Sequence, residues 1–374
     1  MAKHKAHQGD EPIIPRYGRG CVTDVVPALL SPPDAPPAWL PEPAVDAERL
    51  VLLMLDGLGW EQLDARRKIA PTLASMTGGP ITTVAPSTTA TALTSVVTGS
   101  PPGEHGIIGY RINVAGEVLN ILRWSTSTGD ARDRIRPARL QTLEPFGGQR
   151  PPVVTRTEFA GSGFTQAHLA GTRLCGYRIP SALVVEVAAL VNGGEPFVYA
   201  YYDGVDKASH AYGLGVHYDA ELVAADRLVA DLLGALPSRT TLVVIADHGQ
   251  VEVGDNVVSI DRAVLDHVSL QSGEGRFRWL HARQGHHDDL LAAADACHGD
   301  QAWVRSREQI EAEQWLGPKV SDAARRRLGD VAVVAREDLA FEEATDTGLY
   351  DLVGRHGSLT PAEMFVPLIA MTTD

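Results

Sequence analysis

Short apolar runs, each close to an aspartate or a histidine, recur along this chain of 374 residues. The runs have five to seven residues, the length of a β-strand buried on both faces. Between two of them, Asp219–Leu236 places apolar side chains at three- and four-residue spacing, which predicts an amphipathic helix. Because strand, helix and strand in this order form a βαβ unit, we expect an α/β fold: a mainly parallel sheet with helices on both faces.

Four of these runs stand next to Asp or His, residue types that commonly serve as metal ligands. One such fragment predicts little, because Asp and Gly after a strand form turns and Asp before a helix caps it. Ligands in open α/β sheets collect beyond the carboxyl ends of the strands, where we expect all four fragments. The fragments are Leu50–Leu55 with Asp56, Phe197–Tyr202 with Asp206 and His210, Thr241–Ala246 with Asp247 and His248, and His356 before Phe365–Met371.

These side chains predict a site for two metal ions. Asp206 and His210 are four residues apart, so both point the same way on a helical turn, whereas Asp203 fits that face less simply. Mixed oxygen and nitrogen ligands favour zinc, with manganese or iron as alternatives. The two ligand sets are Asp56, Asp247 and His248, and Asp206, His210 and His356.

A segment rich in hydroxyl groups, Thr82–Gly99, lies between the first two fragments. Pro86, followed by Ser and Thr and then an Ala/Leu/Val run, predicts a loop that enters a helix. A helix N-terminus favours an anion, so a hydroxyl there is placed to attack a phosphate. Ser87 or Thr88 also suits the N-cap, and we expect one hydroxyl to cap the helix and another to attack.

Taken together, these residues resemble the alkaline phosphatase superfamily, most of all its branch of type I phosphodiesterases and nucleotide pyrophosphatases. The matching segments keep the family's order and span roughly residues 50–370. They are LMLDG at 53–57, TG at 98–99 with PPGEHGIIG at 101–109, D-x-x-x-H-x-x-G at 206–213, ADHG at 246–249 and HG at 356–357. The resemblance implies an alkaline-phosphatase-like fold with Asp206, His210 and His356 on one metal, and Asp56, Asp247, His248 and the nucleophile on the other.

The resemblance also indicates which hydroxyl attacks. In the family members compared, the nucleophile stands ten residues before the Gly of the TG pair, which here is Thr89 (99 − 89 = 10). Thr88 is the second choice and Ser87 the third, while Thr91 and Thr94 are expected to be packed or solvated inside the helix. The family usually has Asn after HGI, where it binds a phosphoryl oxygen. This chain has Tyr110 and Arg111 there, so we expect Arg111 to clamp phosphate or Tyr110 to donate a hydrogen bond.

The resemblance implies a two-metal phosphoester hydrolase of the phosphodiesterase/nucleotide pyrophosphatase type. Thr89 would attack phosphorus in line and form a phospho-threonine, with net retention of configuration after hydrolysis. A phosphomonoesterase on the same site is the alternative, with Arg111 as the one named group for the extra charge. A sulfatase relative is disfavoured because no C/S-x-P/A-x-R pattern lies near Thr89. A non-catalytic binding protein is disfavoured because every ligand position is filled.

Composition limits the partners. The net charge of −14 argues against nucleic-acid polymers and anionic membranes, both of which favour a basic face, and it leaves a small phosphorylated substrate such as a nucleotide. The three cysteines form no CxxC pair, and no apolar run approaches a membrane span. The N-terminal residues lack the apolar region of a secretory signal. We therefore expect a soluble, cytoplasmic protein.

The alternation of strands and helices begins after an N-terminal arm and is interrupted by two later segments. Residues 1–48 are rich in proline and predict an extended arm over the surface, before a catalytic domain at 49–374. Residues 111–152 and 255–345 are both candidates for an inserted cap, and the longer second segment is favoured. His281, His286 and His287 fall in this segment and are expected to be solvated, and His105 is expected to be structural rather than catalytic.

Overall fold

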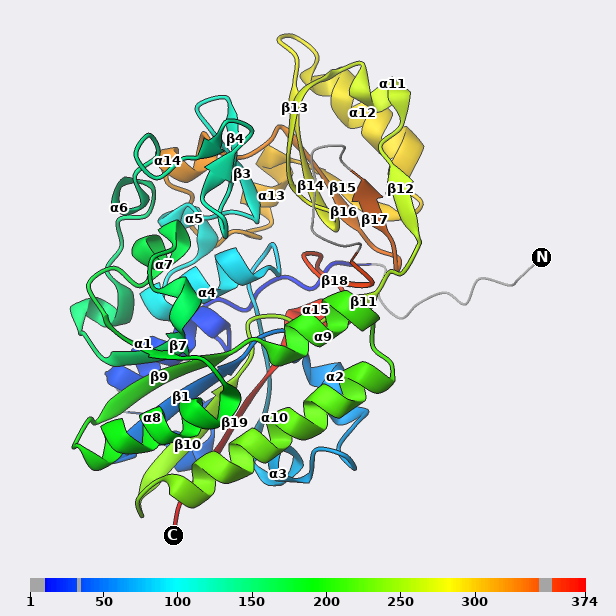
Figure 1. The fold of residues 1–374 in the computed structure, drawn as a ribbon. Helices are drawn as coiled ribbons and strands as arrows, with labels where there is room; N and C mark the ends of the chain where they lie inside the picture. The colour runs from blue at the N-terminus through cyan, green and yellow to red at the C-terminus, as the bar shows by residue number, and fades with distance from the viewer. Residues whose placement is uncertain (1–10, 32–34, 343–351) are drawn as a thin grey trace.

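The computed structural model describes residues 11–31, 35–342 and 352–374. At its centre is a seven-stranded sheet of order β2-β19-β10-β1-β9-β7-β8 (Figure 1). The five strands from β10 to β8 are parallel, which confirms the predicted mainly parallel sheet. The strands are β1 (Arg49–Leu55), β2 (Thr77–Thr82), β7 (Pro152–Arg156), β8 (Arg173–Tyr177), β9 (Phe197–Tyr202), β10 (Thr240–Ile245) and β19 (Phe365–Thr372).

Strand β19 runs antiparallel to both of its neighbours, β10 and β2. We expected all four ligand fragments beyond the carboxyl ends of the strands, and His356 differs from the others in that it precedes the antiparallel strand β19. Leu368 pairs with Ile245, so the start of β19 lies at the edge where β10 ends. The reversed direction brings His356 to the same edge by a different route.

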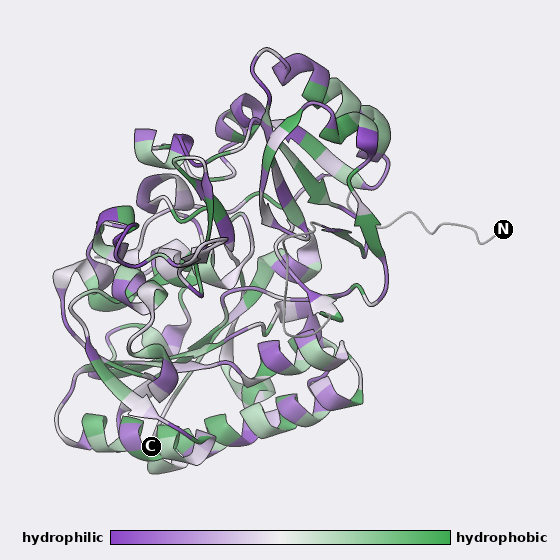
Figure 2. Ribbon diagram, turned by 45° about the horizontal axis from the view of Figure 1, so that its top comes forward, coloured by the Kyte–Doolittle hydropathy of each residue, from purple (hydrophilic) through white to green (hydrophobic). Residues whose placement is uncertain are grey.

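Helices cover both faces of the central sheet (Figure 1). The predicted amphipathic helix is present as α10, and its stripe of Leu222, Ala225, Val229 and Leu232 is buried. Figure 2 shows the result as alternating hydrophobic and hydrophilic bands along this helix. One face carries α3 (Pro71–Ser75), α8 (Pro180–Asn192) and α10 (Val216–Ala235), and the other carries α1 (Val22–Leu30), α4 (Thr89–Thr98) and α7 (Gly163–His168).

The proline-rich N-terminal segment differs from the extended arm that its composition predicts. It contains α1, in which Val22, Val25, Val26 and Leu29 are buried, and this helix packs against α4. These four residues recur at three- and four-residue spacing, a helical pattern that the surrounding prolines hide. Residues 1–10 and 32–34 of the segment lie outside the described residues.

Both segments that break the alternation form sheets of their own. Residues 111–152 contain an antiparallel sheet of β3 (Arg111–Val114), β4 (Glu117–Asn120), β5 (Ser125–Thr126) and β6 (Gly129–Asp130). Residues 255–342 contain a second, larger sheet of order β13-β14-β16-β15, here called the second sheet. Its strands are β13 (Val268–Glu274), β14 (Phe277–Ala282), β15 (Ala302–Ser306) and β16 (Val331–Ala335). The cap role of 255–345 stays a prediction, and residues 343–345 lie outside the described part.

Short elements complete the chain. Two-stranded pairs join β11 (Val251–Glu252) to β18 (Gly354–Arg355) and β12 (Val257–Ser259) to β17 (Ala340–Glu342). No helix in the described ranges is both long enough and apolar enough to cross a bilayer. The remaining helices are α2 (Trp60–Asp64), α5 (Pro102–His105), α6 (Pro137–Leu140), α9 (Gly204–Tyr212), α11 (Arg262–Leu265), α12 (His287–His298), α13 (Arg307–Ala312), α14 (Asp322–Arg325) and α15 (Pro361–Met364), with 3-10 turns at Glu42–Ala44, Pro145–Gly148 and Thr157–Phe159.

Candidate active site

The structure brings all six predicted metal ligands to one edge of the central sheet. Three adjacent strands supply five of them, because β9, β1 and β10 are parallel neighbours whose carboxyl ends meet there. The sixth, His356, arrives just after β18. The ligands are Asp56 after β1, Asp206 and His210 in α9 after β9, Asp247 and His248 after β10, and His356.

The first ligand set lies around one oxygen of Asp206. His210 Nε2 lies 3.2 Å from Asp206 Oδ1, and His356 Nε2 lies 3.8 Å from the same atom. One ligand atom of each of these residues lies within 4.8 Å of the others. Asp203, the weaker alternative to Asp206, instead pairs with Lys207 at 2.6 Å and with Arg156 at 3.3 Å.

The second set surrounds His248. Its Nε2 lies 3.5 Å from Asp56 Oδ1 and 3.4 Å from Asp247 Oδ2. Asp206 also lies within 4.8 Å of the ligand atoms of Asp56 and His248, so the two sets adjoin. Gly57, at φ 76°, turns the chain after β1 and donates its N–H to Asp247 Oδ1 at 3.0 Å. A Cβ at Gly57 would lie 2.9 Å from the Asp206 backbone, so the close approach of α9 to this turn requires glycine.

Backbone carbonyls hold all three histidines in one tautomer. Nδ1 of His210 donates to Gly354 O at 2.7 Å, Nδ1 of His248 to Gly249 O at 3.0 Å, and Nδ1 of His356 to Ser87 O at 2.9 Å. A carbonyl only accepts, so the proton is on Nδ1 and the lone pair of Nε2 faces the carboxylates. This arrangement is typical of histidines that bind metal through Nε2.

The buried carboxylates lack the partners that burial demands. Asp56 and Asp247 are at most 1% exposed, and Asp56 Oδ1 and Asp247 Oδ2 accept no hydrogen bond from any described residue. Burial raises the pKa of Asp56, and the neighbouring Asp247 and Asp206 raise it further. Burial also raises the pKa of Asp247. Since unpaired buried charge is costly, the donor set fits divalent cations, which would compensate both oxygens.

Thr89 stands beside this cluster as the first residue of α4. Its Oγ1 lies 3.1 Å from His248 Nε2, whose lone pair accepts the hydroxyl hydrogen. Thr88 occupies the N-cap position, as predicted for Ser87 or Thr88. The expected capping hydroxyl is not found, because neither side chain accepts a helix N–H. Ser87 Oγ instead donates to Ser358 O at 2.6 Å and accepts from Gly357 N at 3.2 Å, which ties the segment after His356 to the start of α4.

An apolar cavity of about 130 Å³ opens beside Thr89. The His168 ring stacks on Phe164 with centroids 3.9 Å apart, and burial lowers the pKa of His168 to about 4, so this imidazole is neutral at pH 7. No charged side chain is among the described residues that line the cavity. The lining residues are Thr89, Leu93, Leu122, Val153, Thr155, Phe159, Ser162, Phe164, Thr165, His168, Leu169, Tyr199 and Tyr201.

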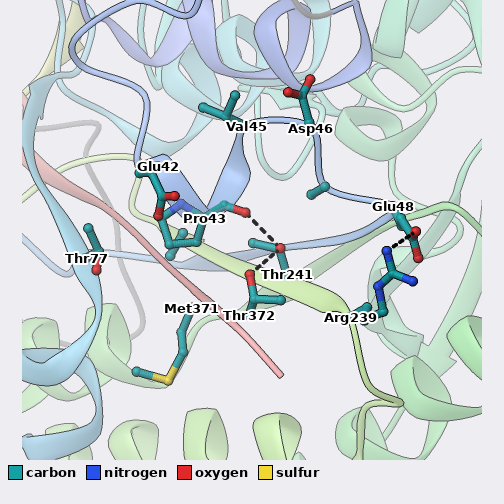
Figure 3. Close-up of a pocket in the computed structure, with 12 residues that line it drawn as sticks. Glu42, Pro43, Val45, Asp46, Glu48, Thr77, Arg239, Thr241, Met371 and Thr372 are labelled. Atoms are coloured by element: carbon teal, nitrogen blue, oxygen red, sulfur yellow. Dashed lines mark hydrogen bonds and ion pairs between the residues drawn. The ribbon is translucent and has the colours of Figure 1, made fainter. Parts of the chain in front are cut away.

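A larger hollow of about 430 Å³ lies at the opposite edge of the sheet, where β10 begins and β19 ends (Figure 3). Thr241 Oγ1 donates there to Pro43 O at 2.9 Å and lies 2.8 Å from Thr372 Oγ1, and Arg239 pairs with Glu48 at 2.6 Å. The six residues of β10 separate this hollow from Asp247 by about 20 Å. It contains none of the predicted ligands, so we place the active site at the other edge.

Comparison with known proteins agrees with this geometry. The sequence profile of type I phosphodiesterase / nucleotide pyrophosphatase matches residues 50–180 and 180–359. The chain belongs to this family. Its members hydrolyse phosphoesters and generally depend on divalent metal ions, which the ligand groups described above fit. No curated protein matches the chain.

Solved structures of the alkaline phosphatase superfamily share the fold. Murine ectonucleotide pyrophosphatase/phosphodiesterase 5, in an inactive Thr-to-Ala variant bound to AMP, matches with a TM-score of 0.67 at 15% identity, over 86% of this chain and 87% of that one. The human protein of the same name matches with a TM-score of 0.60 at 15% identity, over 86% and 87%. Phosphonoacetate hydrolase from Sinorhizobium meliloti, bound to phosphonoformate, matches with a TM-score of 0.63 at 18% identity, over 87% and 90%. The predicted alkaline-phosphatase-like fold is confirmed.

This chain departs from the family pattern at Tyr110 and Arg111. The Tyr110 hydroxyl accepts a hydrogen bond from Asn120 Nδ2 at 2.6 Å, and Arg111 begins β3, where it pairs with Asn120 in register. Neither residue lines the cavity beside Thr89. Their roles in phosphate binding stay predictions.

Two residues of the candidate site were not predicted from the sequence. The Tyr201 hydroxyl donates to Asp56 Oδ2, and the buried Gln250 donates from Nε2 to Asp206 Oδ1 at 2.7 Å. The backbone carbonyl of Gln250 accepts a hydrogen bond from Gln62 Nε2 at 2.6 Å. Gln250 directly follows the ADHG motif, and this adjacency is the signal that would have identified it.

Proposed function

We propose that this protein hydrolyses phosphodiesters of small molecules, nucleotide esters among them, through a phosphoryl-threonine intermediate on Thr89. The observation that carries the proposal is the position of the Thr89 hydroxyl. It lies 3.1 Å from His248 Nε2 at the first residue of a helix, and it also lines the apolar cavity. A helix N-terminus favours the negative charge of a phosphate beside it.

The proposed reaction has two steps. The Thr89 oxygen forms a bond to phosphorus while the bond from phosphorus to the leaving oxygen breaks, and the departing alcohol gains a proton. Water then attacks phosphorus, the bond to Thr89 breaks, and the hydroxyl regains its proton. The cavity walls bind one organic group of the substrate and exclude water from it.

Asp206, His210 and His356 would hold one divalent ion, and Asp56, Asp247, His248 and Thr89 the other. Zinc is our first choice and manganese the second, because the donors mix carboxylate oxygens with imidazole nitrogens. Such ions supply positive charge to phosphoryl oxygens and lower the pKa of a bound hydroxyl.

The apolar cavity favours a diester over a monoester. A diester carries one negative charge at phosphorus and two organic groups, one of which an uncharged cavity accommodates. The AMP and the inactive Thr-to-Ala variant of the murine neighbour support both a nucleotide-like substrate and an essential threonine.

The test compares bis-p-nitrophenyl phosphate with p-nitrophenyl phosphate in the presence of Zn²⁺ or Mn²⁺. Thr88→Ala is the matched control for Thr89→Ala, because the two hydroxyls are adjacent and only that of Thr89 contacts His248. We expect preference for the diester, loss of turnover in Thr89→Ala and retention in Thr88→Ala. Preference for the monoester would indicate a phosphatase instead, and equal loss in both variants would overturn the assignment of Thr89.

A further inference from the structure

A second group of metal-binding side chains lies away from the active site. His267, His286 and Asp289 each place one ligand atom within 4.8 Å of the others. His267 precedes β13, whereas His286 and Asp289 stand at the start of α12. Figure 1 shows α11 and α12 at the outer end of the second sheet, away from the central sheet.

The two imidazoles face each other through the same atom. Nδ1 of His267 lies 3.0 Å from Nδ1 of His286, and Asp289 Oδ2 lies 3.7 Å from the latter. Two ligands about 2.1 Å from one Zn²⁺ ion are roughly 3.0–3.4 Å apart, depending on the angle between them. The observed distance between the nitrogens therefore matches adjacent ligands of one ion.

Backbone hydrogen bonds fix this pair independently of the side chains. Arg283 N donates to His267 O at 2.8 Å, and His286 N donates to Arg283 O at 3.0 Å. The pairing of Val268 with Ala282 continues this contact into the β13–β14 hairpin. The first turn of α12 then carries Asp289 three residues after His286, on the same helical face. Backbone hydrogen bonds thus hold the segments that carry the three donors in fixed relative positions.

We propose that His267, His286 and Asp289 bind a divalent transition-metal ion, separate from the catalytic centre. Two imidazole nitrogens and one carboxylate oxygen suit Zn²⁺. The side chains of His286 and Asp289 are 44% and 66% exposed, so water completes the coordination. An ion here links the segment before β13 to the start of α12 and so stabilises this end of the second sheet.

The test counts bound Zn²⁺ by equilibrium dialysis and elemental analysis. His267→Gln/His286→Gln is compared with His287→Gln, which changes the adjacent histidine outside the group. We expect one equivalent fewer in the double variant, no change in His287→Gln, and wild-type diester hydrolysis in both. His4 and His7 are present in the wild type and in both variants, so any Zn²⁺ that they bind cancels in the difference between the metal counts.

Zn²⁺ affinity and the spectrum of bound Cu²⁺ test the same site. Asp289→Asn changes an exposed position and is expected to weaken Zn²⁺ binding at this site about tenfold. Cu²⁺ bound to the wild-type protein should show nitrogen hyperfine coupling in electron paramagnetic resonance, part of which disappears in the double variant. Equal metal counts and equal spectra in the wild type and a folded double variant would overturn the site and leave two imidazoles that share a proton. Because the readout is a difference at an independent site, it stands even if the catalytic proposal fails.

Discussion

The two edges of the central sheet carry similar kinds of residues and differ in how those residues are paired. At the edge where β10 ends, Asp56 and Asp247 are buried with oxygens that no described residue satisfies. At the edge where β10 begins, Arg239 pairs with Glu48, and Thr241 bonds Pro43 and Thr372. The larger hollow lies at this second edge.

Unsatisfied buried charge, rather than the size of a hollow, therefore distinguishes the edge that carries the candidate active site. Paired and exposed groups are already close to their lowest free energy, so they gain little from a ligand. Two buried carboxylates that repel each other gain a great deal from a cation.

Loss of the Thr89 hydroxyl should have the largest effect. Thr89→Ala is expected to lower kcat/KM for a diester roughly 10³-fold or more, because the bond-forming oxygen is removed. Thr241→Ala removes a hydroxyl of the same kind at the opposite edge and should leave kcat/KM nearly unchanged. Steady-state kinetics on both variants, with circular dichroism as a folding control, checks this contrast. Comparable losses in the two variants would refute it.

Removal of divalent ions should abolish activity and also lower the melting temperature. Without cations, the carboxylates of Asp56 and Asp247 are left buried and uncompensated. Dialysis against a chelator, followed by activity and melting assays, tests both effects, and added Zn²⁺ or Mn²⁺ should reverse them. Full activity in protein shown to be free of metal would contradict the two-metal proposal.

The Tyr201 hydroxyl should matter less than the ligands that it supports. Tyr201→Phe removes the hydrogen bond to Asp56 and is expected to weaken metal binding roughly 10- to 100-fold. The matched control is Tyr202→Phe, because the adjacent hydroxyl donates to Glu221 instead. Metal titrations of activity distinguish the two, and equal metal affinities would show that Tyr201 plays no part in the site.

Acid should destabilise the protein through His105, which lies in α5 and packs against α4. Its Nδ1 accepts from Ile107 N at 3.1 Å and its Nε2 donates to Ser95 at 2.8 Å, while burial lowers the pKa of His105 to about 3. The unfolded value is about 6.5. The unfolded state therefore binds the extra proton between these values, so stability is present above pH 6.5 and is lost as the pH falls below it. We expect a loss of about 1.4 kcal/mol per pH unit in this window from His105 alone.

Urea unfolding between pH 7.5 and 5 measures this dependence. His105→Gln should show a shallower loss of unfolding free energy than the wild-type protein. An unchanged slope in His105→Gln would mean that His105 is not held neutral.

The smallest effect is expected at the opposite edge. Glu48→Gln removes an ion pair in which the Arg239 side chain is 74% exposed, so the change in unfolding free energy should be below about 1 kcal/mol. Diester hydrolysis should not change. A clear loss of activity in Glu48→Gln would show that the two edges are not functionally distinct.

The sequence predicted the parallel strands well because they depend on local patterns. The six candidate ligands lie together at one edge of the sheet, and their metal binding stays a prediction. An apolar run followed by Asp is readable without knowledge of the fold, and β9 has the predicted bounds. His356 was grouped by motif with Asp206 and His210, and the three residues lie close together. The antiparallel course of β19 was not predicted, because it is set by pairing with β10.

The supporting contacts were not predictable in the same way. Tyr201 reaches Asp56 across 145 residues, and Ser87 lies opposite Gly357 across 270 residues. Such contacts depend on the register of neighbouring strands and loops, which no local pattern encodes. The helix α1 was missed for a different reason, since the prolines on both sides of its apolar residues outweighed their helical spacing.

Trapping the phosphoryl-threonine intermediate tests most directly whether Thr89 is the nucleophile. The enzyme is mixed with bis-p-nitrophenyl phosphate, quenched in acid within a turnover, and digested for mass spectrometry. We expect a phosphoryl adduct on Thr89 in the wild-type protein and none in Thr89→Ala. Turnover without an adduct, or an adduct on Thr88, would contradict this expectation.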